Sequence, residues 1–342
     1  MGTAKLVDVA RRAGVSVGTV SNVLNRPDQV RPATREKVEQ AVRELGFVRN
    51  DSARQLRSGT SRLLAYVLPD ARNPFFTDVA RAAQERAREH DLALVLCDAD
   101  SVAAQEDEFL ALLLERRLRG ALITSVDYTN PRLRELPGLG LPIVLVDHIE
   151  PPDSPIPSVG VDDIAGARAA VAHLIELGHR RIAFVGTPGS MAQVTGRHAG
   201  ALAALGDAGL PEDALVVVET DWLSAQDGRR AAARILELPA EERPTAVFCA
   251  NDMLALGVLQ EASLRGLAVP DDLAIVGYDD IEFASIAAVP LPSVRQPRHD
   301  LGTIAVDLIL AGDDVVDRHP VLQPELVVRA STAGRAAPTP AP

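Results

Sequence analysis

The sequence has few of the features that stabilise proteins outside the cytoplasm. It contains only two cysteines, Cys97 and Cys249, each within an apolar run, and no residue cluster with the spacing of a metal site. This excludes a disulfide-rich secreted scaffold and fits a reducing compartment. No stretch of about 20 residues is apolar and free of charge, as a membrane span requires, and residues 1–6 lack the apolar core of a secretory signal. We therefore expect a cytoplasmic protein rather than a secreted or membrane protein.

Catalytic motifs are missing as well. The sequence has no G-x-S-x-G nucleophile elbow, no H-E-x-x-H zinc motif and no G-x-x-x-x-G-K-[ST] phosphate loop. Adjacent aspartates such as Asp279 and Asp280 suggest acid–base pairs, but neighbouring side chains of an extended chain point to opposite faces. We predict that the protein is not an enzyme and needs neither a cofactor nor a metal.

Charge is divided unevenly along the 342 residues, a length that suggests two or more domains. Residues 1–60, which we call the head, carry 11 Lys and Arg against 6 Asp and Glu, a net charge of +5. The remaining residues, which we call the body, carry 24 against 41, a net charge of −17. This division predicts that the head binds a polyanion, which the body would repel.

Three short helices are predicted in residues 4–46 of the head. Gly14 favours the left-handed turn that ends the first helix, Ser16 can cap the second, and Pro32 suits the first turn of the third. Two helices joined by such a turn have helix-turn-helix spacing, in which the second helix enters the DNA major groove. The alternative is a small helical bundle that binds protein or nothing. The residues predicted to meet DNA from this segment are Ser16, Val17, Gly18, Thr19, Ser21, Asn22 and Asn25.

Residues 50–57 can form two further helical turns that expose Leu56 between cations. Eight residues alone do not hold a helix in water, because nucleation costs too much. An apolar side chain flanked by arginines suits insertion into the minor groove, so this segment is predicted to fold on DNA. The alternative is a plain interdomain linker. The predicted DNA-contacting residues here are Asn50, Ala53, Arg54, Leu56 and Arg57.

From Arg62 onward, strand-like apolar runs alternate with helical stretches. This order predicts parallel sheets with helices on both faces, and its length predicts two lobes. Open parallel sheets bind ligands beyond the carboxyl ends of their strands. Polar and aromatic residues at such places suit a polyol, because aromatic rings cover its C–H faces and polar side chains bind its hydroxyls. The predicted effector-binding residues are Asn73, Phe75, Phe76, Asp147, Arg197, Trp222, Asn251 and Asp279.

Several of these residues also have an ordinary structural explanation. The two phenylalanines could belong to the core, and Trp222 could pack between the lobes. Arg197 could be a surface charge on its helix. Asn251 and Asp252 could cap the helix that follows them, a role that we assign mainly to Asp252.

Several motifs together resemble the lactose-repressor/galactose-repressor (LacI/GalR) family. In the head they are Val7-Asp8-Val9-Ala10, Ala13-Gly14-Val15-Ser16, Thr19-Val20-Ser21, Val23-Leu24-Asn25, Thr34-Arg35-Glu36-Lys37-Val38 and Leu45-Gly46-Phe47. In the body they are Asn73-Pro74-Phe75-Phe76, Leu177-Gly178-His179, Ala250-Asn251-Asp252, Ala255-Leu256-Gly257, Val276-Gly277-Tyr278-Asp279-Asp280 and Arg295-Gln296-Pro297. The match runs from about residue 5 to residue 330. Asn50, Ala53 and Leu56 resemble the hinge helix of that family.

The resemblance implies a fold class and a domain order. The head would be an all-α helix-turn-helix domain, and the body an α/β periplasmic-binding-protein-like unit of two doubly wound parallel-sheet lobes. The effector contacts of the family fall on the predicted effector-binding residues. The expected segments are a DNA-binding domain (1–49), a hinge helix and linker (50–61), an effector-binding and dimerisation body (62–330, with lobes of about 62–160 and 161–330 and crossovers between them) and a disordered tail (331–342).

The sequence departs from the common family pattern at four places. Asn22 stands where the family often has Arg, Gly18 has no side chain to read bases, Arg31 replaces a usual capping Ser, and Arg49 replaces a usual Pro. These changes leave the fold intact, but they leave the DNA half-site open.

We interpret the protein as a transcriptional repressor that acts as a homodimer on a pseudo-palindromic operator. A small-molecule effector between the lobes, a carbohydrate or a sugar-derived metabolite, would control its operator affinity. If Arg298 faced the cleft, the effector would carry an acidic group. The alternatives are a sugar-binding receptor without a regulatory role, which predicts a signal peptide and no basic head, and an enzyme of small-sugar metabolism.

Overall fold

The computed structural model describes residues 4–47, 61–116, 118–189, 191–314 and 316–332. It divides into two units, Met1–Thr60 and Ser61–Pro342, which correspond to the head and the body. The predicted hinge residues Asn50, Ala53, Arg54, Leu56 and Arg57 lie outside the described residues. No helix in the described ranges is both long and apolar enough to span a bilayer.

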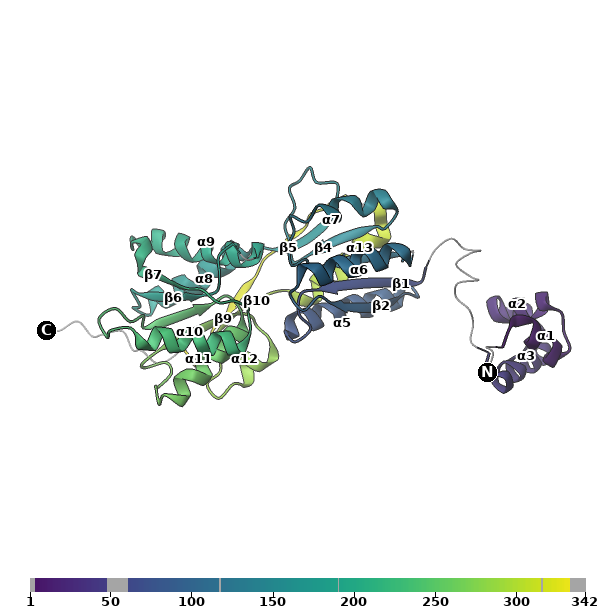
Figure 1. The fold of residues 1–342 in the computed structure, drawn as a ribbon, viewed down its shortest axis with the longest axis horizontal. Helices are drawn as coiled ribbons and strands as arrows, with labels where there is room; N and C mark the ends of the chain where they lie inside the picture. The colour runs from purple at the N-terminus through teal and green to yellow at the C-terminus, as the bar shows by residue number, and fades with distance from the viewer. Residues whose placement is uncertain (1–3, 48–60, 117, 190, 315, 333–342) are drawn as a thin grey trace. The chain divides into compact units, whose positions relative to one another are not determined.

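The head is a three-helix unit, as the sequence predicts (Figure 1). Val9, Val20 and Val38, one from each helix, are fully buried against one another's helices. Gly14 adopts a φ of 66°, a left-handed conformation that ends the first helix without the strain that a Cβ would bring. The elements of the head are α1 (Leu6–Ala13), α2 (Val17–Asn25), the one-turn η1 (Pro27–Gln29) and α3 (Pro32–Leu45).

The first lobe of the body is built on a six-stranded parallel sheet in the order β11-β5-β4-β3-β1-β2. Helices lie on both faces of this sheet, so most of its strands are buried on both sides and read as continuous apolar runs. The strands are β1 (Leu63–Leu68), β2 (Ala93–Asp98), β3 (Gly120–Ile123), β4 (Ile143–Val146), β5 (Ser158–Val161) and β11 (Val321–Leu322). The helices are α5 (Pro74–Glu89), α6 (Ala103–Glu115), α7 (Pro131–Glu135), η2 (Pro137–Leu139), α13 (Arg298–Ala311) and η4 (Gly312–Asp314).

The second lobe repeats this architecture in the order β12-β10-β9-β8-β6-β7. Its edge strand β12 is antiparallel to β10, whereas the sequence predicts only parallel pairing. The strands are β6 (Ile182–Val185), β7 (Leu215–Val218), β8 (Ala246–Cys249), β9 (Ala274–Asp279), β10 (Ser293–Arg295) and β12 (Glu325–Val327). The helices are α8 (Asp163–Glu176), α9 (Ala192–Asp207), η3 (Glu212–Ala214), α10 (Ala225–Glu237), α11 (Asp252–Leu264) and α12 (Glu282–Ile286).

The chain passes between the lobes three times. It leaves the first sheet after β5 to form α8, returns after β10 to form α13, and leaves again after β11 to form β12. Three neighbouring connections of this kind form a hinge about which two packed lobes can close. The last described residues, Ser331 and Thr332, are buried, and Ser331 donates to the carbonyl of Ile275 at 2.6 Å. The body therefore extends into residues that the sequence assigns to the tail.

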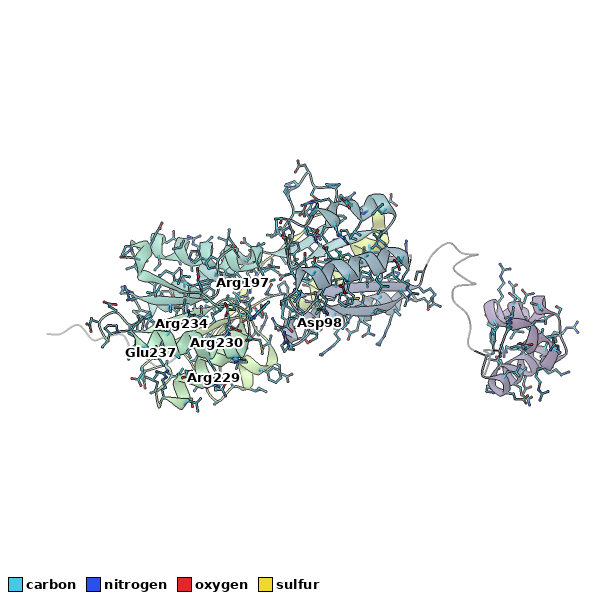
Figure 2. The ribbon with its side chains drawn as sticks, in the orientation of Figure 1. Asp98, Arg197, Arg229, Arg230, Arg234 and Glu237 are labelled. Atoms are coloured by element: carbon cyan, nitrogen blue, oxygen red, sulfur yellow. The ribbon has the colours of Figure 1, made fainter. Side chains whose placement is uncertain are left out.

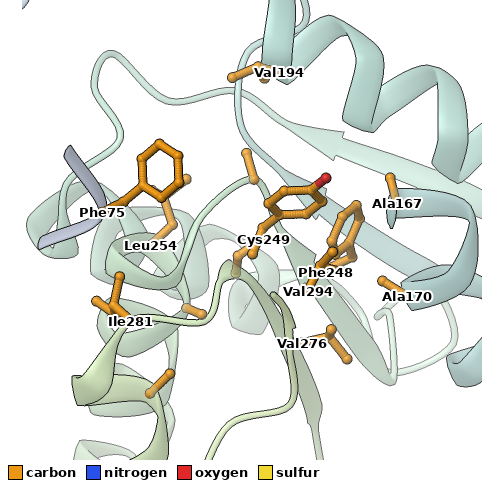
Figure 3. Close-up of a cluster of buried hydrophobic side chains, with 14 of the residues drawn as sticks. Phe75, Ala167, Ala170, Val194, Phe248, Cys249, Leu254, Val276, Ile281 and Val294 are labelled. Atoms are coloured by element: carbon orange, nitrogen blue, oxygen red, sulfur yellow. The ribbon is translucent and has the colours of Figure 1, made fainter. Parts of the chain in front are cut away.

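The principal core belongs to the body and includes residues of both lobes. Phe184, Phe248 and Tyr278 are fully buried in it. Figure 3 shows Phe75, which comes from α5 of the first lobe, in the same cluster as Leu254 of the second. A shared core keeps the lobes as one body while the connections between them set the geometry of the cleft.

Candidate DNA interface and effector site

Helix α2 begins with a side-chain cap. Ser16 Oγ accepts a hydrogen bond from the Thr19 backbone N–H at 3.0 Å and lies 2.9 Å from Thr19 Oγ1. This confirms Ser16 as the predicted cap of the second helix. Ser21 is half-buried, and Asn25 is the last residue of the helix. The free N–H groups at the start of α2 suit a phosphate oxygen.

Helix α2 has one buried face and one exposed face. Val20 and Val23 are buried in the head's core. Val17, Gly18 and Asn22 are exposed, at helical spacing on the opposite side. A helix anchored by one face can enter a groove with the other, where an Asn side chain can bind an adenine edge and an apolar group can touch a thymine methyl. This face is the candidate DNA-reading surface.

The body contains a cavity of about 690 Å³ between its lobes, beyond the carboxyl ends of the strands. This volume falls in the usual range for a small-molecule site. Residues from both lobes line it, and they include all eight of the predicted effector-binding residues. These are Asn73, Phe75, Phe76, Asp147, Arg197, Trp222, Asn251 and Asp279.

Arg197 of α9 is held rigidly at the cavity wall (Figure 2). It donates to Asp163 at 2.8 Å and to the carbonyl of Ala250 at 2.7 Å. Its guanidinium carbon lies 3.7 Å from the centre of the Tyr278 ring, close enough for a cation–π contact. Burial opposes its charge, but the charges of Asp163 and Asp279 raise the pKa of Arg197 further above its ordinary value. Arg197 is therefore a buried permanent cation and not the surface charge of the alternative interpretation.

Asp147 follows β4 and adopts a φ of 57°, a left-handed conformation that is rare for residues with a side chain. Such strain is commonly kept at functional sites. Gln193 of α9 reaches across from the second lobe and donates to the Asp147 carbonyl at 2.6 Å and to Asp147 Oδ2 at 3.2 Å. Burial, and then the charge of Asp163, raise the pKa of Asp147 well above its ordinary value.

Asp279 ends β9 and also has a left-handed backbone, with a φ of 103°. Its carboxylate accepts hydrogen bonds from Gln296 at 2.8 Å and from Asn73 of the first lobe at 3.3 Å. Burial raises its pKa, although the neighbouring Arg197 lowers it. Arg298 donates to the carbonyl oxygens of Asp279 and Asp280 at 3.0 and 2.6 Å and is not among the residues that line the cavity. Arg298 thus holds the backbone at Asp279 and Asp280 in place. Because it does not face the cavity, it gives no reason to expect an acidic effector.

Asn251, and not Asp252, caps the helix that follows β8. Asn251 is the N-cap of α11, where its side chain accepts from the Leu254 N–H at 2.9 Å. Asp252 is fully buried and accepts from Ser293 Oγ at 2.7 Å and from the Ile281 N–H at 2.8 Å. The prediction that Asp252 is mainly the cap is therefore wrong, because its side chain points into the core to hold the chain after β9.

The aromatic residues of the cavity differ in exposure. Phe75 is 1% exposed and belongs mainly to the core, Phe76 is 8% exposed, and Trp222 is 52% exposed. Phe76 and Trp222 come from different lobes and both line the cavity. They can supply the flat apolar walls that the C–H faces of a polyol require.

Comparison with known proteins decides the family. The family model of bacterial regulatory proteins, lacI family, matches residues 5–50, and a periplasmic binding protein-like domain matches residues 171–332. The HTH-type transcriptional repressor CytR of Escherichia coli (strain K12) is 34% identical over 336 residues, which cover 96% of this chain and 96% of that protein. The chain belongs to the lacI family of bacterial regulatory proteins.

Solved structures of similar proteins have the same architecture. The lac repressor dimer bound to operator and the anti-inducer ONPF matches with a TM-score of 0.82 and 30% identity, over 97% of this chain and 100% of that one. The complex of the transcriptional regulator CelR with cellobiose matches with a TM-score of 0.70 and 31% identity, over 96% of this chain and 99% of that one. These matches confirm the predicted fold class. This lacI-family chain is a DNA-binding transcription regulator, and its relatives are regulators rather than enzymes.

In this lacI-family protein the cavity lining, the candidate effector site, also includes residues that the sequence does not single out. Their polar side chains come from loops after strands and from the first turns of helices. Several of them follow β1, β2 and β7, so the strand-end rule could have found them. Gln193 is the second residue of α9, and no pattern in the sequence marks it. The added polar residues include Asp70, Arg72, Asp100, Gln193, Thr220, Asp221, Asp227 and Arg230.

Proposed function

We propose that this lacI-family regulator represses transcription by binding a pseudo-palindromic operator as a homodimer. A small-molecule effector, a carbohydrate or a sugar-derived metabolite, enters the cavity between the lobes and changes the operator affinity. The protein acts in the cytoplasm, on the nucleoid. The observation that carries this proposal is the convergence of eight separately predicted residues on one cavity, in a chain that also has a helix-turn-helix head.

The head supports the DNA-binding part of this proposal. Its net charge of +5 favours a polyanion, while the net charge of −17 on the body disfavours one. The exposed face of α2 offers Val17 and Asn22 for base contacts, and Ser16 and Thr19 stand at the helix start for phosphate contacts.

The connections between the two lobes support the proposed coupling between effector binding and operator binding. Arg197 is bonded to Asp163, which follows the first connection between the lobes. Asp279 is bonded to Gln296, which lies in the second connection. A ligand that binds both Arg197 and Asp279 acts directly on two connections, so it can shift lobe closure. Such coupling is typically worth about 1–3 kcal/mol, enough for about a 5- to 150-fold change in affinity.

The edge of the first sheet supports dimerisation. Strand β2 lies at this edge, and its Val95 and Leu96 side chains are 46% and 48% exposed. An edge strand with exposed apolar side chains is usually covered in native proteins. We propose that a second copy of the chain covers this edge and brings two heads to the two operator half-sites.

A gel-shift titration with the upstream DNA of the gene itself tests this function. We expect the full-length protein to protect a palindromic site and to lose affinity steeply as salt rises, because phosphate contacts release counterions. A chain that lacks residues 1–60 serves as the control and should not bind. Binding that is independent of sequence and salt would contradict the proposal.

The Leu56→Ala variant tests the predicted hinge helix. Losing an apolar wedge should weaken specific operator binding by about 1–3 kcal/mol, roughly 5- to 150-fold. Effector affinity, measured by calorimetry, should stay unchanged because the body is intact. Equal losses of operator and effector affinity would count against the hinge assignment.

A further inference from the structure

Two of the arginines that line the effector cavity form ion pairs with aspartates of the same lining. Arg72 donates to Asp70 at 2.8 Å and to Asp100 at 2.7 Å, both in the first lobe. Arg230, labelled in Figure 2, pairs with Asp227 in the second lobe. Each guanidinium group thus has a carboxylate of the cavity wall as its partner. Neither group offers an uncompensated positive charge to a ligand.

The third arginine of the lining is also compensated, and the cavity as a whole is acidic. Arg197 donates to Asp163 at 2.8 Å and lies 3.7 Å from an oxygen of Asp279. Among the described lining residues, six aspartates stand against three arginines. A phosphate or carboxylate placed here would meet like charges at short range in a partly dehydrated site.

Three buried polar atoms of this lining have no hydrogen-bond partner within the described parts of the chain. They are Asp147 Oδ1, Gln193 Oε1 and Thr220 Oγ1. Asp147 and Gln193 are each only 5% exposed. Buried polar atoms are nearly always satisfied, and an unsatisfied one needs an explanation. Gln193 Oε1 is an amide oxygen, which only accepts, and Asp147 Oδ1 accepts when its carboxyl group is ionised, so a hydrogen-bond donor is the partner that both atoms can share.

The two residues that carry these oxygen atoms belong to different lobes and are hydrogen-bonded to each other. Asp147 follows β4 of the first lobe, and Gln193 lies in α9 of the second. The amide nitrogen of Gln193 must face Asp147, because both the carbonyl and Oδ2 of Asp147 are acceptors, at 2.6 and 3.2 Å from it. The amide oxygen is therefore left free, beside the free carboxylate oxygen.

We propose that the effector is an unphosphorylated, donor-rich molecule, uncharged or cationic, and that it donates hydrogen bonds to Asp147 Oδ1 and Gln193 Oε1 together. Gln193 is then a specificity-determining residue, and the bound donors bridge the two lobes. Neighbouring hydroxyl groups of a free sugar, an amino sugar or a nucleoside ribose have the required chemistry. This inference rests on the proposed function, since it defines the chemistry of that effector.

Calorimetric titration of the full-length protein tests this inference. The probes are free pentoses, hexoses, amino sugars, disaccharides and ribonucleosides, and each is compared with its own monophosphate. The class of compound that binds shows which kind of molecule supplies the hydrogen-bond donors. We expect a free compound to bind and its phosphate to bind about 100-fold more weakly, because like charges at the site repel it. A phosphate that binds as well as its parent, or a panel in which no free compound binds, overturns the inference. The proposed function is tested separately by the gel shift: a full-length protein that fails to bind its operator there would contradict the proposed function, whatever the titration shows.

The Gln193→Met variant tests the role of this residue. Methionine keeps the length of the side chain and removes its acceptor, so affinity for the bound free compound should fall about tenfold. Gln260→Met, the same change at an exposed residue of α11 that does not line the cavity, should leave affinity within about threefold, which is below 1 kcal/mol. Equal losses in the two variants would overturn the assignment. Operator binding and the thermal midpoint of both variants show that the fold is kept.

Discussion

The Arg197→Met variant is expected to lose its effector response and about 3–5 kcal/mol of the body's free energy of unfolding. Arg197 is 4% exposed and compensates the carboxylates of Asp279, which is buried, and of Asp163, whose side chain is 13% exposed. Methionine fills much of the space but leaves these charges unpaired. Urea unfolding followed by the fluorescence of Trp222, the only tryptophan, measures the loss in the body.

The pH dependence of this loss identifies its cause. Burial already raises the pKa of both Asp163 and Asp279, and removing Arg197 raises it further. Both aspartates then take up protons more readily in the folded state than in the unfolded state. Their uncompensated charge destabilises the variant above these raised pKa values and is relieved as pH falls. The deficit should therefore be larger at pH 8 than at pH 5, and a deficit that grows on acidification would refute this cause.

Arg168→Met is the matched control for this experiment. Arg168 pairs with Asp207 at 2.6 Å, but their side chains are 57% and 54% exposed. An exposed pair of this kind contributes about 0–1 kcal/mol. If Arg168→Met lowered the free energy of unfolding as much as Arg197→Met does, burial of the Arg197 ion pairs would not explain the loss of stability.

The Gly257→Ala variant is expected to destabilise the body by about 3 kcal/mol. A Cβ on Gly257 would lie 2.0 Å from the carbonyl oxygen of Ala225, so α10 and α11 would have to move apart. Backbone atoms of a packed helix cannot yield as the end of a flexible side chain can. Asp227 of the cavity lining lies in α10, and Asn251 is the N-cap of α11, so effector affinity should fall as well. Urea unfolding and calorimetry measure the two effects.

The Gly206→Ala variant, on another helix, is expected to change the body's free energy of unfolding in the opposite direction. Gly206 lies in α9, and a Cβ there would meet nothing within 4 Å. Alanine should therefore stabilise the body by up to about 1 kcal/mol, through helix propensity alone. Equal destabilisation by the two variants would mean that close helix packing at Gly257 is not the cause.

The central strands of both lobes were predictable because burial on both faces makes them continuous apolar runs. Leu63–Leu68, Ile143–Val146 and Ile182–Val185 are apolar runs of this kind in the sequence, and each has the bounds of a strand in the structure. The strands that the sequence did not reveal are short, such as Val321–Leu322 and Glu325–Val327. Two or three residues carry no readable period, and their pairing partners lie far away in the chain.

The effector cavity was predictable where its residues follow strands, as Asp147 and Asp279 do. The strand-end rule depends only on the order of elements, which local patterns reveal. Asn251 and Asp252 show the limit of this rule. Both residues suit a helix cap, and only the packing of Ser293 and Ile281 around Asp252 shows which of them does the capping.

The amino-acid sequence alone was enough to identify a basic helix-turn-helix head, an acidic body of alternating strands and helices, and five of the polar residues that line the cavity between the lobes. These features depend on local periodicity, composition and motifs, which are properties of the chain itself. Only the folded body revealed that Gln193 meets Asp147 across the lobes, that the three arginines of the cavity are neutralised, and that Arg298 supports a loop. Such pairings join residues that are distant in the chain, so they exist only once packing has brought the two sheets together.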